Sequence, residues 1–240
     1  MKRSFVFRLL AFCALPVLSA CVPSIAAEQA RAVPAPKLDA PLAAQHGKQT
    51  AVLAGGCFWG LQWVFEHVKG VTNVTSGYSG GSANTAQYER VSEGDTGHAE
   101  SVRIEFDPAQ VSYGQLLRVY FSVATDPTQL NRQGPDTGTQ YRGVIFYSTP
   151  QQQKIARAYI AQLAAAKTFD APIVTQVAKF NAFYPAEQYH QDYARIHPDE
   201  PYIAINDAPK VVHLQQLLPE LYRPQPLIWR TSGAIAVDVL

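Results

Sequence analysis

The stretch GGCFWG, residues 55–60, places a cysteine between two glycines and two large aromatic side chains. Cys57 falls between a short apolar run that predicts a strand and an apolar pattern with helical spacing. At the start of a helix, free backbone N–H groups and the helix dipole favour a thiolate. Gly55 and Gly56 permit a tight turn and the close approach of a ligand. The pattern predicts a nucleophile; the competing interpretation is a small buried core residue.

Phe58 and Trp59 follow the cysteine directly. The predicted helix already has an apolar stripe, formed by Leu61, Val64, Phe65 and Val68. The two additional aromatic residues therefore indicate an apolar cup for a substrate. A carboxyl group held in such a cup has its charged form disfavoured, which raises its pKa. It can then act as an acid near neutral pH.

The first twenty residues are typical of a secretion signal. MKRSFVFR carries three basic residues, and an apolar run of about ten residues follows, which is too short to span a bilayer. The sequence LSAC, residues 18–21, resembles the lipobox of bacterial lipoproteins. We expect residues 1–20 to be removed, Cys21 to be lipidated, and the protein to be held at a membrane in the bacterial periplasm. An ordinary signal cleaved within SIAA is the alternative.

The chain has three cysteines, Cys13, Cys21 and Cys57. Cys13 is lost with the expected signal and Cys21 is blocked by the expected lipid, so Cys57 is the only free thiol of the mature chain. An intramolecular disulfide is therefore excluded. Removal of residues 1–20 leaves a net charge of −2 without a basic cluster, which argues against nucleic acid as a partner.

Composition divides the rest of the chain into three parts. Residues 21–48 are rich in alanine and proline and predict a flexible tether. Residues 49–221 predict the catalytic domain, and residues 222–240 a C-terminal tail. Two long polar segments, 79–100 and 126–142, predict functional loops.

Between residues 51 and 148 the hydrophobic patterns predict the order strand, helix, strand, strand, helix, strand. This order is typical of the ferredoxin-like fold. We expect an α+β, two-layer sandwich with an added C-terminal strand and helices. The added helices are predicted from Pro150 to about 167, from 185 to 196 and from 209 to 221.

Several motifs in chain order resemble the peptide-methionine (S)-S-oxide reductases, the A-type methionine sulfoxide reductases. They are GGCFWG, TGHAE at 96–100, the segment DPTQ to QYR at 126–142, and AEQYHQDY. The resemblance covers about residues 50–213 and implies a ferredoxin-like core with added elements. It implies an oxidoreductase that reduces the S epimer of methionine sulfoxide, in proteins or free, without a metal or an organic cofactor.

The resemblance also implies a role for each matched residue. Cys57 corresponds to the nucleophile that attacks the sulfoxide sulfur. Phe58 and Trp59 correspond to the pocket that receives the substrate methyl group. Glu100 corresponds to the acid that protonates the sulfoxide oxygen.

Three more residues are matched in the two polar segments. Tyr88 and Tyr141 correspond to phenols that hold the sulfoxide oxygen by hydrogen bonds, and Asp136 to a supporting carboxylate. Loop anchoring is the other interpretation of the two tyrosines. His98 and His190 neighbour the matched residues, and we expect structural roles for them.

The chain departs from the family at its resolving cysteines. Many relatives carry one or two more cysteines near the C-terminus, which attack the sulfenic acid and form a disulfide that thioredoxin reduces. Here the segment after Tyr193 has none, and Ser92 stands where some relatives have one. We therefore expect an external thiol, of glutathione type or in a thioredoxin-like protein, to resolve the Cys57 sulfenic acid.

Two other functions remain as alternatives. A cysteine hydrolase or acyltransferase would use Cys57 with His98 or His190 and with Asp136. A non-catalytic binding lipoprotein would keep the fold without turnover. For the sulfoxide reductase we expect a monomer.

Overall fold

The computed structural model describes residues 30–231, and the terminal segments 1–29 and 232–240 lie outside the described residues. The expected signal peptide and Cys21 therefore fall outside them. Among residues 30–231, none of the helices combines the length and the apolar character needed to cross a bilayer.

Four strands form the centre of the sheet. They are β1 (Gln49–Ala54), β2 (Val71–Ser79), β3 (Ala99–Phe106) and β6 (Val144–Tyr147). Their order in the sheet is β6-β1-β3-β2, and each neighbouring pair is antiparallel. This is the ferredoxin-like arrangement, so the predicted element order and the α+β fold class are confirmed.

Two short strands extend this sheet, and two more form a separate hairpin. Strand β7 (Gln176–Lys179) pairs in parallel with β6, and β8 (Phe183–Pro185) pairs antiparallel with β2. Strands β4 (Arg132–Gln133) and β5 (Asp136–Thr137) pair with each other inside the second long polar segment.

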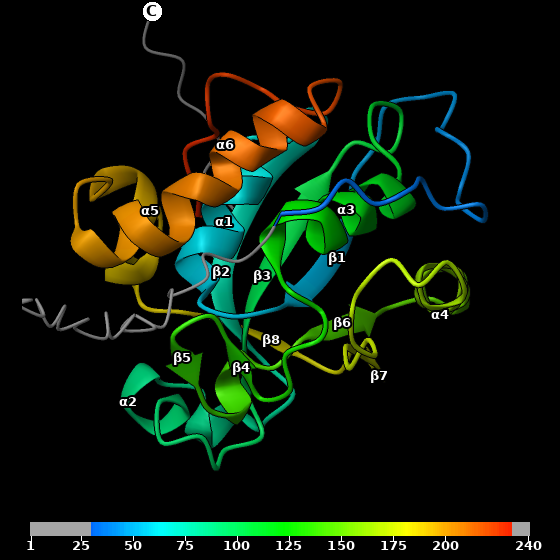
Figure 1. Ribbon diagram of the computed structural model, residues 1–240. Coiled ribbons are helices and arrows are strands. Elements are labelled where there is room, and N and C mark those ends of the chain that lie inside the picture. Colours follow the sequence, from blue (N-terminus) through cyan, green and yellow to red (C-terminus); the bar gives the residue numbers. More distant parts are fainter. Residues whose placement is uncertain (1–29, 232–240) are drawn as a thin grey trace, which may run out of the picture.

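The helical layer covers one face of the sheet. Its main helices are α1 (Phe58–Glu66), α3 (Tyr113–Val119), α4 (Pro150–Ala165) and α6 (Ala208–Leu217). A π-turn continues α3 through Tyr120–Ala124. In Figure 1, α6 runs beside α1 over the sheet, while α4 lies at the β6 and β7 edge.

Strand alternation places the core on both faces of the sheet. Leu53 and Ile104 are buried in the main cluster beneath the helices, and Val52 and Phe146 belong to a smaller cluster on the opposite face. Successive strand residues point to opposite faces, which explains why the neighbours Val52 and Leu53 enter different clusters.

Two helices begin at well-formed caps, and the second is the helix predicted from Pro150. The Ser112 hydroxyl accepts from the backbone N–H of Gln115, and the Gln115 side chain accepts from the Ser112 N–H, which forms a capping box. The Thr149 hydroxyl accepts from the Gln152 N–H, and Pro150 occupies the first position of α4.

The helix predicted from 185 to 196 is wrong. Pro185 ends β8, a 3₁₀ turn covers Gln188–His190, and only the short α5 (Tyr193–Ile196) is α-helical. Asp192 has φ of 57°, a left-handed conformation that a continuous α-helix excludes.

Residues 30–48, which the sequence predicted to be part of a flexible tether, pack against the domain. Val33 is buried against the core, and the Arg31 N–H donates to the Ser122 carbonyl at 2.8 Å. The Tyr159 hydroxyl donates to the Pro34 carbonyl at 2.6 Å, and Asp39 accepts from the Gly114 N–H at 2.8 Å. Composition without periodicity predicts irregular backbone, but irregular backbone can still pack against a domain.

Residues 222–231, the described part of the predicted tail, pack across the end of α1. The Arg223 N–H donates to the His67 carbonyl at 2.7 Å, and the Leu227 N–H to the Glu66 carbonyl at 3.0 Å. The Trp229 N–H donates to Asp192 at 3.1 Å. The first two of these bonds satisfy carbonyl groups that the end of a helix leaves unpaired.

Candidate active site

Cys57 is the residue that immediately precedes α1, as the sequence predicted. It follows β1 through Gly55 and Gly56, and Gly56 has φ of 100°, a conformation that favours glycine. A Cβ atom on Gly56 would lie 2.6 Å from the Gln133 side chain, so the turn also requires a small residue. Cys57 is 9% exposed and is the only free cysteine among the described residues.

Glu100, on β3, is joined to the start of α1. The Phe58 N–H donates to its Oε2 at 3.0 Å, and the residue is 3% exposed. Burial raises the pKa of Glu100 to about 8, with smaller contributions from the charges of Asp136 and Asp207. The Phe58 hydrogen bond acts in the opposite direction but does not outweigh burial. Glu100 is therefore a carboxylic acid at neutral pH.

The surroundings of Cys57 oppose the thiolate that a helix start favours. Burial raises the pKa of the thiol well above its usual range, and the charges of Glu100 and Asp207 raise it further. The Trp59 backbone N–H lowers this pKa, as expected at a helix start, but it is outweighed. The resting nucleophile is a thiol beside a protonated acid.

The two aromatic residues after Cys57 have different environments. Phe58 is buried, with its ring centroid 5.1 Å from that of His190 and 5.8 Å from that of Tyr78. Trp59 is half-buried and stacks on Tyr193 at a centroid distance of 3.9 Å. The Trp59 indole N–H donates to His190 Nδ1 at 3.1 Å. His190 therefore fixes the orientation of a partly exposed indole, which is the structural role expected for it.

Both long polar segments contribute to the site, as predicted. Tyr88 begins the short helix α2 (Tyr88–Val91), and Tyr141 ends a 3₁₀ turn. Burial raises the pKa of both phenols, and the charges of Glu100, Asp136 and Cys57 raise them further. Both tyrosines are therefore hydrogen-bond donors within electrostatic range of the thiol and the acid.

Sequence reasoning missed Tyr202 and Asp207, which enter the site from the segment before α6. The Tyr202 hydroxyl donates to Asp136 Oδ2 at 2.5 Å, and its ring meets Trp59 edge-on at 6.2 Å. Asp207 is fully buried, and its charge affects both Cys57 and Glu100. No motif indicated these residues, since only the packing of α6 on α1 brings them to the site.

Glu187 holds two tyrosines that surround the site, Tyr78 and Tyr88, by hydrogen bonds. Its carboxylate accepts from the Tyr78 hydroxyl at 2.9 Å and from the Tyr88 N–H at 3.1 Å. His98 accepts from the Gly81 N–H and lies 3.0 Å from the Ser82 carbonyl, so backbone contacts hold its ring.

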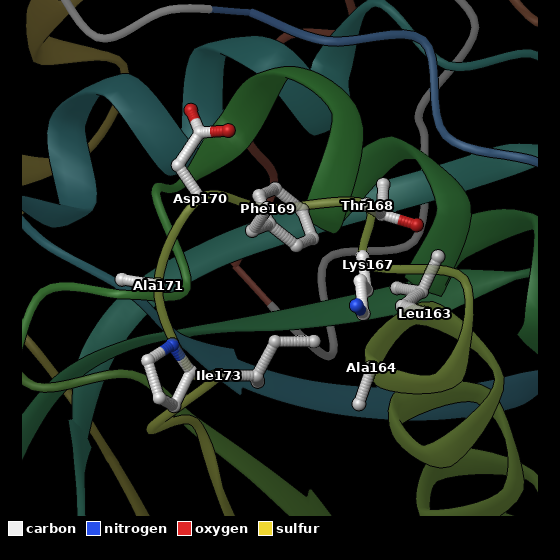
Figure 2. Close-up of a pocket in the computed structure, with 9 residues that line it drawn as sticks. Leu163, Ala164, Lys167, Thr168, Phe169, Asp170, Ala171 and Ile173 are labelled. Carbon is white, nitrogen blue, oxygen red and sulfur yellow. The ribbon is translucent and has the colours of Figure 1, made fainter.

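The hollow in Figure 2 is a separate feature. It lies at the C-terminal end of α4 and is lined by residues 163–164 and 167–173. None of the site residues described above, such as Cys57, Glu100 and Tyr202, lines this hollow. Within residues 30–231, no group of three or more His, Cys, Asp or Glu side chains is placed to hold a metal ion.

Comparison with known proteins gives one consistent result. The family model described as peptide methionine sulfoxide reductase matches residues 49–220. A relative from Mesorhizobium japonicum, named peptide methionine sulfoxide reductase MsrA 2, is 58% identical over 76% of this chain and 93% of its own length. A relative of the same name from Synechocystis is 56% identical over 71% of this chain and 79% of its own length.

Solved structures agree with these sequence matches. Methionine sulfoxide reductase A of Corynebacterium diphtheriae is 35% identical, with a TM-score of 0.55, over 65% of this chain and 77% of that chain. Mxr1 from Saccharomyces cerevisiae in reduced form is 28% identical, with a TM-score of 0.57, over 68% and 92%. The chain therefore belongs to the peptide methionine sulfoxide reductase family and is an oxidoreductase of the MsrA type.

Proposed function

We propose that the protein reduces the S epimer of methionine sulfoxide, in proteins or as the free amino acid, by oxygen transfer to Cys57. The observation that supports this most directly is the buried carboxyl of Glu100, which accepts from the Phe58 N–H in the first turn of the helix that Cys57 precedes and whose pKa burial raises to about 8. A sulfoxide oxygen leaves sulfur only after protonation, so a thiol beside a neutral acid suits this reaction.

In the proposed reaction each part of the sulfoxide has its own contacts in the site. The methyl group lies against Phe58 and Trp59, and the oxygen faces Glu100 and the hydroxyls of Tyr88 and Tyr141. The Trp59 ring, held by His190 and Tyr193, forms a fixed wall that limits how the sulfoxide enters. A fixed wall on one side selects between the two epimers.

In the first step the Cys57 sulfur attacks the substrate sulfur while Glu100 protonates the oxygen. This attack forms an S–S bond. The protonated oxygen then transfers to the Cys57 sulfur as the S–S bond and the substrate S–O bond break, so the substrate sulfur gains two electrons and the Cys57 sulfur loses two. The oxygen is left on Cys57, so a thiol and a sulfoxide become a sulfenic acid and a thioether. The proton released by the thiol restores Glu100, and no net proton is consumed.

The second step uses a thiol from outside the chain, such as glutathione or a thioredoxin-like protein. This thiol attacks the Cys57 sulfenic acid, forms a mixed disulfide and releases water; a second thiol then restores Cys57. The proposal is supported by the absence of any other cysteine from residues 30–231. Cys13 and Cys21 both belong to the proposed export signal.

We further propose that the protein acts outside the cytoplasm, in the periplasm, with a lipid on Cys21. The signal composition of residues 1–20 and the LSAC sequence support this. Labelling with a radioactive fatty acid tests it: the wild type is expected to be labelled and Cys21→Ala unlabelled. Equal labelling of both would refute the lipid site.

The hydrolase alternative receives little support from the histidines. His190 accepts from the Trp59 indole, and His98 contacts the backbone of Gly81 and Ser82. A base that activates Cys57 would need one of these rings to contact the sulfur.

The deciding experiment measures reduction of both sulfoxide epimers with dithiothreitol, using wild type and Cys57→Ser. Turnover of the S epimer alone, lost in the variant, is the expected result, and turnover of the R epimer would refute the stereochemistry. Mass spectrometry after one turnover without reductant should show one added oxygen on Cys57. Ester hydrolysis without sulfoxide turnover would support the hydrolase, and ligand binding without turnover the non-catalytic lipoprotein.

A further inference from the structure

The third glycine of GGCFWG, Gly60, lies inside α1, one turn after Cys57. Glycine within a helix is less stable than alanine, so its presence there calls for a structural reason. A Cβ atom on Gly60 would lie 2.0 Å from Oδ1 of Asp207 and 2.6 Å from its Cγ. Gly60 therefore makes room for a carboxylate against the first turn of α1.

Asp207 is not used as an ordinary helix cap. It immediately precedes α6, where aspartate often accepts a bond from the helix N–H groups, yet its side chain makes no capping bond. The residue is fully buried and its Oδ1 lies 3.3 Å from Nζ of Lys210, which is itself 6% exposed. A buried ion pair carries a large desolvation cost, so stability alone does not account for it.

The position of this carboxylate relates it to the nucleophile. Residues three apart on a helix are neighbours on one face, which places the Asp207 carboxylate beneath the turn that Cys57 begins. The titratable groups that act on Cys57 come from the elements packed around it. The charges that raise the pKa of Cys57 are those of Glu100 of β3, Asp136 of β5 and Asp207. The charge of Cys57 in turn raises the pKa of Tyr88 of α2, Tyr141 of the turn before β6 and Tyr202 of the segment before α6, and Lys210 of α6 pairs with Asp207.

We propose that Asp207 is a positioning residue of this active site, with Lys210 as its counter-ion. Its carboxylate, seated in the space left by Gly60, adds to burial in keeping the proton on the Cys57 thiol. A protonated Cys57 thiol reacts slowly with most electrophiles, because the thiolate is the nucleophilic form. It can still react with a sulfoxide whose oxygen Glu100 protonates. The consequence for turnover rests on the proposed function, whereas the effect on the thiol does not.

The electrostatics of the site agree with this geometry. Burial makes the largest contribution to the raised pKa of Cys57, and the charge of Glu100 makes the next largest. The charge of Asp207 follows and exceeds that of Asp136. Asp207 also contributes to the raised pKa of Glu100. One buried charge therefore acts on both groups that handle protons in the reaction.

The test follows the rate of iodoacetamide alkylation of Cys57 against pH in the full chain, with the modified residue identified by mass spectrometry. Asp207→Asn is expected to lower the midpoint of the profile by about one pH unit, because a nearby like charge is removed. Lys210→Met is expected to raise it. Asp107→Asn, which removes a buried carboxylate remote from the site, serves as the control and should leave it unchanged.

An unchanged midpoint in Asp207→Asn, or shifts of the same sign in Asp207→Asn and Lys210→Met, would overturn the proposal. Loss of sulfoxide turnover with the expected shifts intact would contradict the proposed function and leave the role of Asp207 standing. The two failures are therefore distinguishable, since alkylation requires no sulfoxide.

A second pair of variants tests the contact itself. Gly60→Ala is expected to lower the Tm and the alkylation midpoint in the wild-type chain, because its methyl group meets the Asp207 carboxylate. In the Asp207→Ala background that carboxylate is absent, so Gly60→Ala should cause a smaller loss of Tm and no further shift of the midpoint. Equal effects in both backgrounds would show that Gly60 does not serve Asp207.

Discussion

Replacing Glu100 with glutamine should stabilise the protein while it abolishes most of the activity. The side chains have the same shape, and the glutamine carbonyl can still accept the Phe58 N–H. Glu100 has a pKa of about 8 in the folded chain against 4.5 for an ordinary glutamate. The folded state therefore binds this proton more tightly than the unfolded state, and stability falls as pH rises from 4.5 to about 8.

The size of the effect follows from that shift. At about 1.4 kcal/mol per pH unit, folding with this proton bound costs about 3 kcal/mol at pH 7 and about 1 kcal/mol at pH 5. Glu100→Gln carries no such cost, so its free energy of unfolding should exceed that of wild type by about these amounts. Loss of the acid should lower kcat by about 10²- to 10⁴-fold.

Urea unfolding of wild type and Glu100→Gln at pH 5, 7 and 8 measures the difference directly. The exposed Glu89→Gln is the matched control and should show no comparable gain with pH. If Glu100→Gln gains no more stability at pH 7 than at pH 5, Glu100 is not held protonated in the folded chain, and the reasoning about the acid fails. In the wild type, kcat/KM should fall above pH 8 as this acid ionises.

Three further predictions concern other parts of the molecule. Trp59→Phe removes the indole bond to His190 and should raise KM for the sulfoxide several-fold while leaving the pH profile of Cys57 alkylation unchanged, as measured by mass spectrometry. Asp39→Ala removes an acceptor from the start of α3 and should lower the free energy of unfolding by about 1–3 kcal/mol in urea with kcat unaffected. Burial raises the pKa of Glu66 to about 10, so wild type should lose stability as pH rises from 4.5 towards 10, and Glu66→Gln should show a smaller decline in urea unfolding between pH 7 and 9.

The fold was predictable because its strands and helices each have a hydrophobic pattern that is visible in the local sequence. Apolar and polar residues alternate in SVRIEF, which indicates a strand, and the apolar residues after Cys57 have helical spacing. The order of these elements along the chain is compatible with few topologies. The loop containing Tyr88 and the loop containing Tyr141 were predicted to be functional from their length and polarity. Their meeting at one thiol follows from the antiparallel order of the sheet.

Other features depend on tertiary structure and had no local signal. The protonation of Cys57 is decided by burial, which outweighs the helix start, and burial at a given residue cannot be read from spacing. Asp207 lies 150 residues after Cys57 in the chain and resembles a helix cap in sequence. Asp192 breaks a predicted helix through its backbone conformation, which residue type alone does not specify.

The packing of residues 30–48 has a consequence for the proposed lipid on Cys21, because it would limit how far the domain can lie from a membrane. An extended chain spans at most about 3.5 Å per residue, so a free tether from Cys21 to Gln49 would reach about 100 Å. Because Arg31 is already bonded to the domain, the available contour length from a lipid on Cys21 falls to about 35 Å. With such an anchor, the domain would stay in a thin layer next to the bilayer. The oxidised methionines within its reach would then belong mainly to membrane-bound or membrane-adjacent proteins.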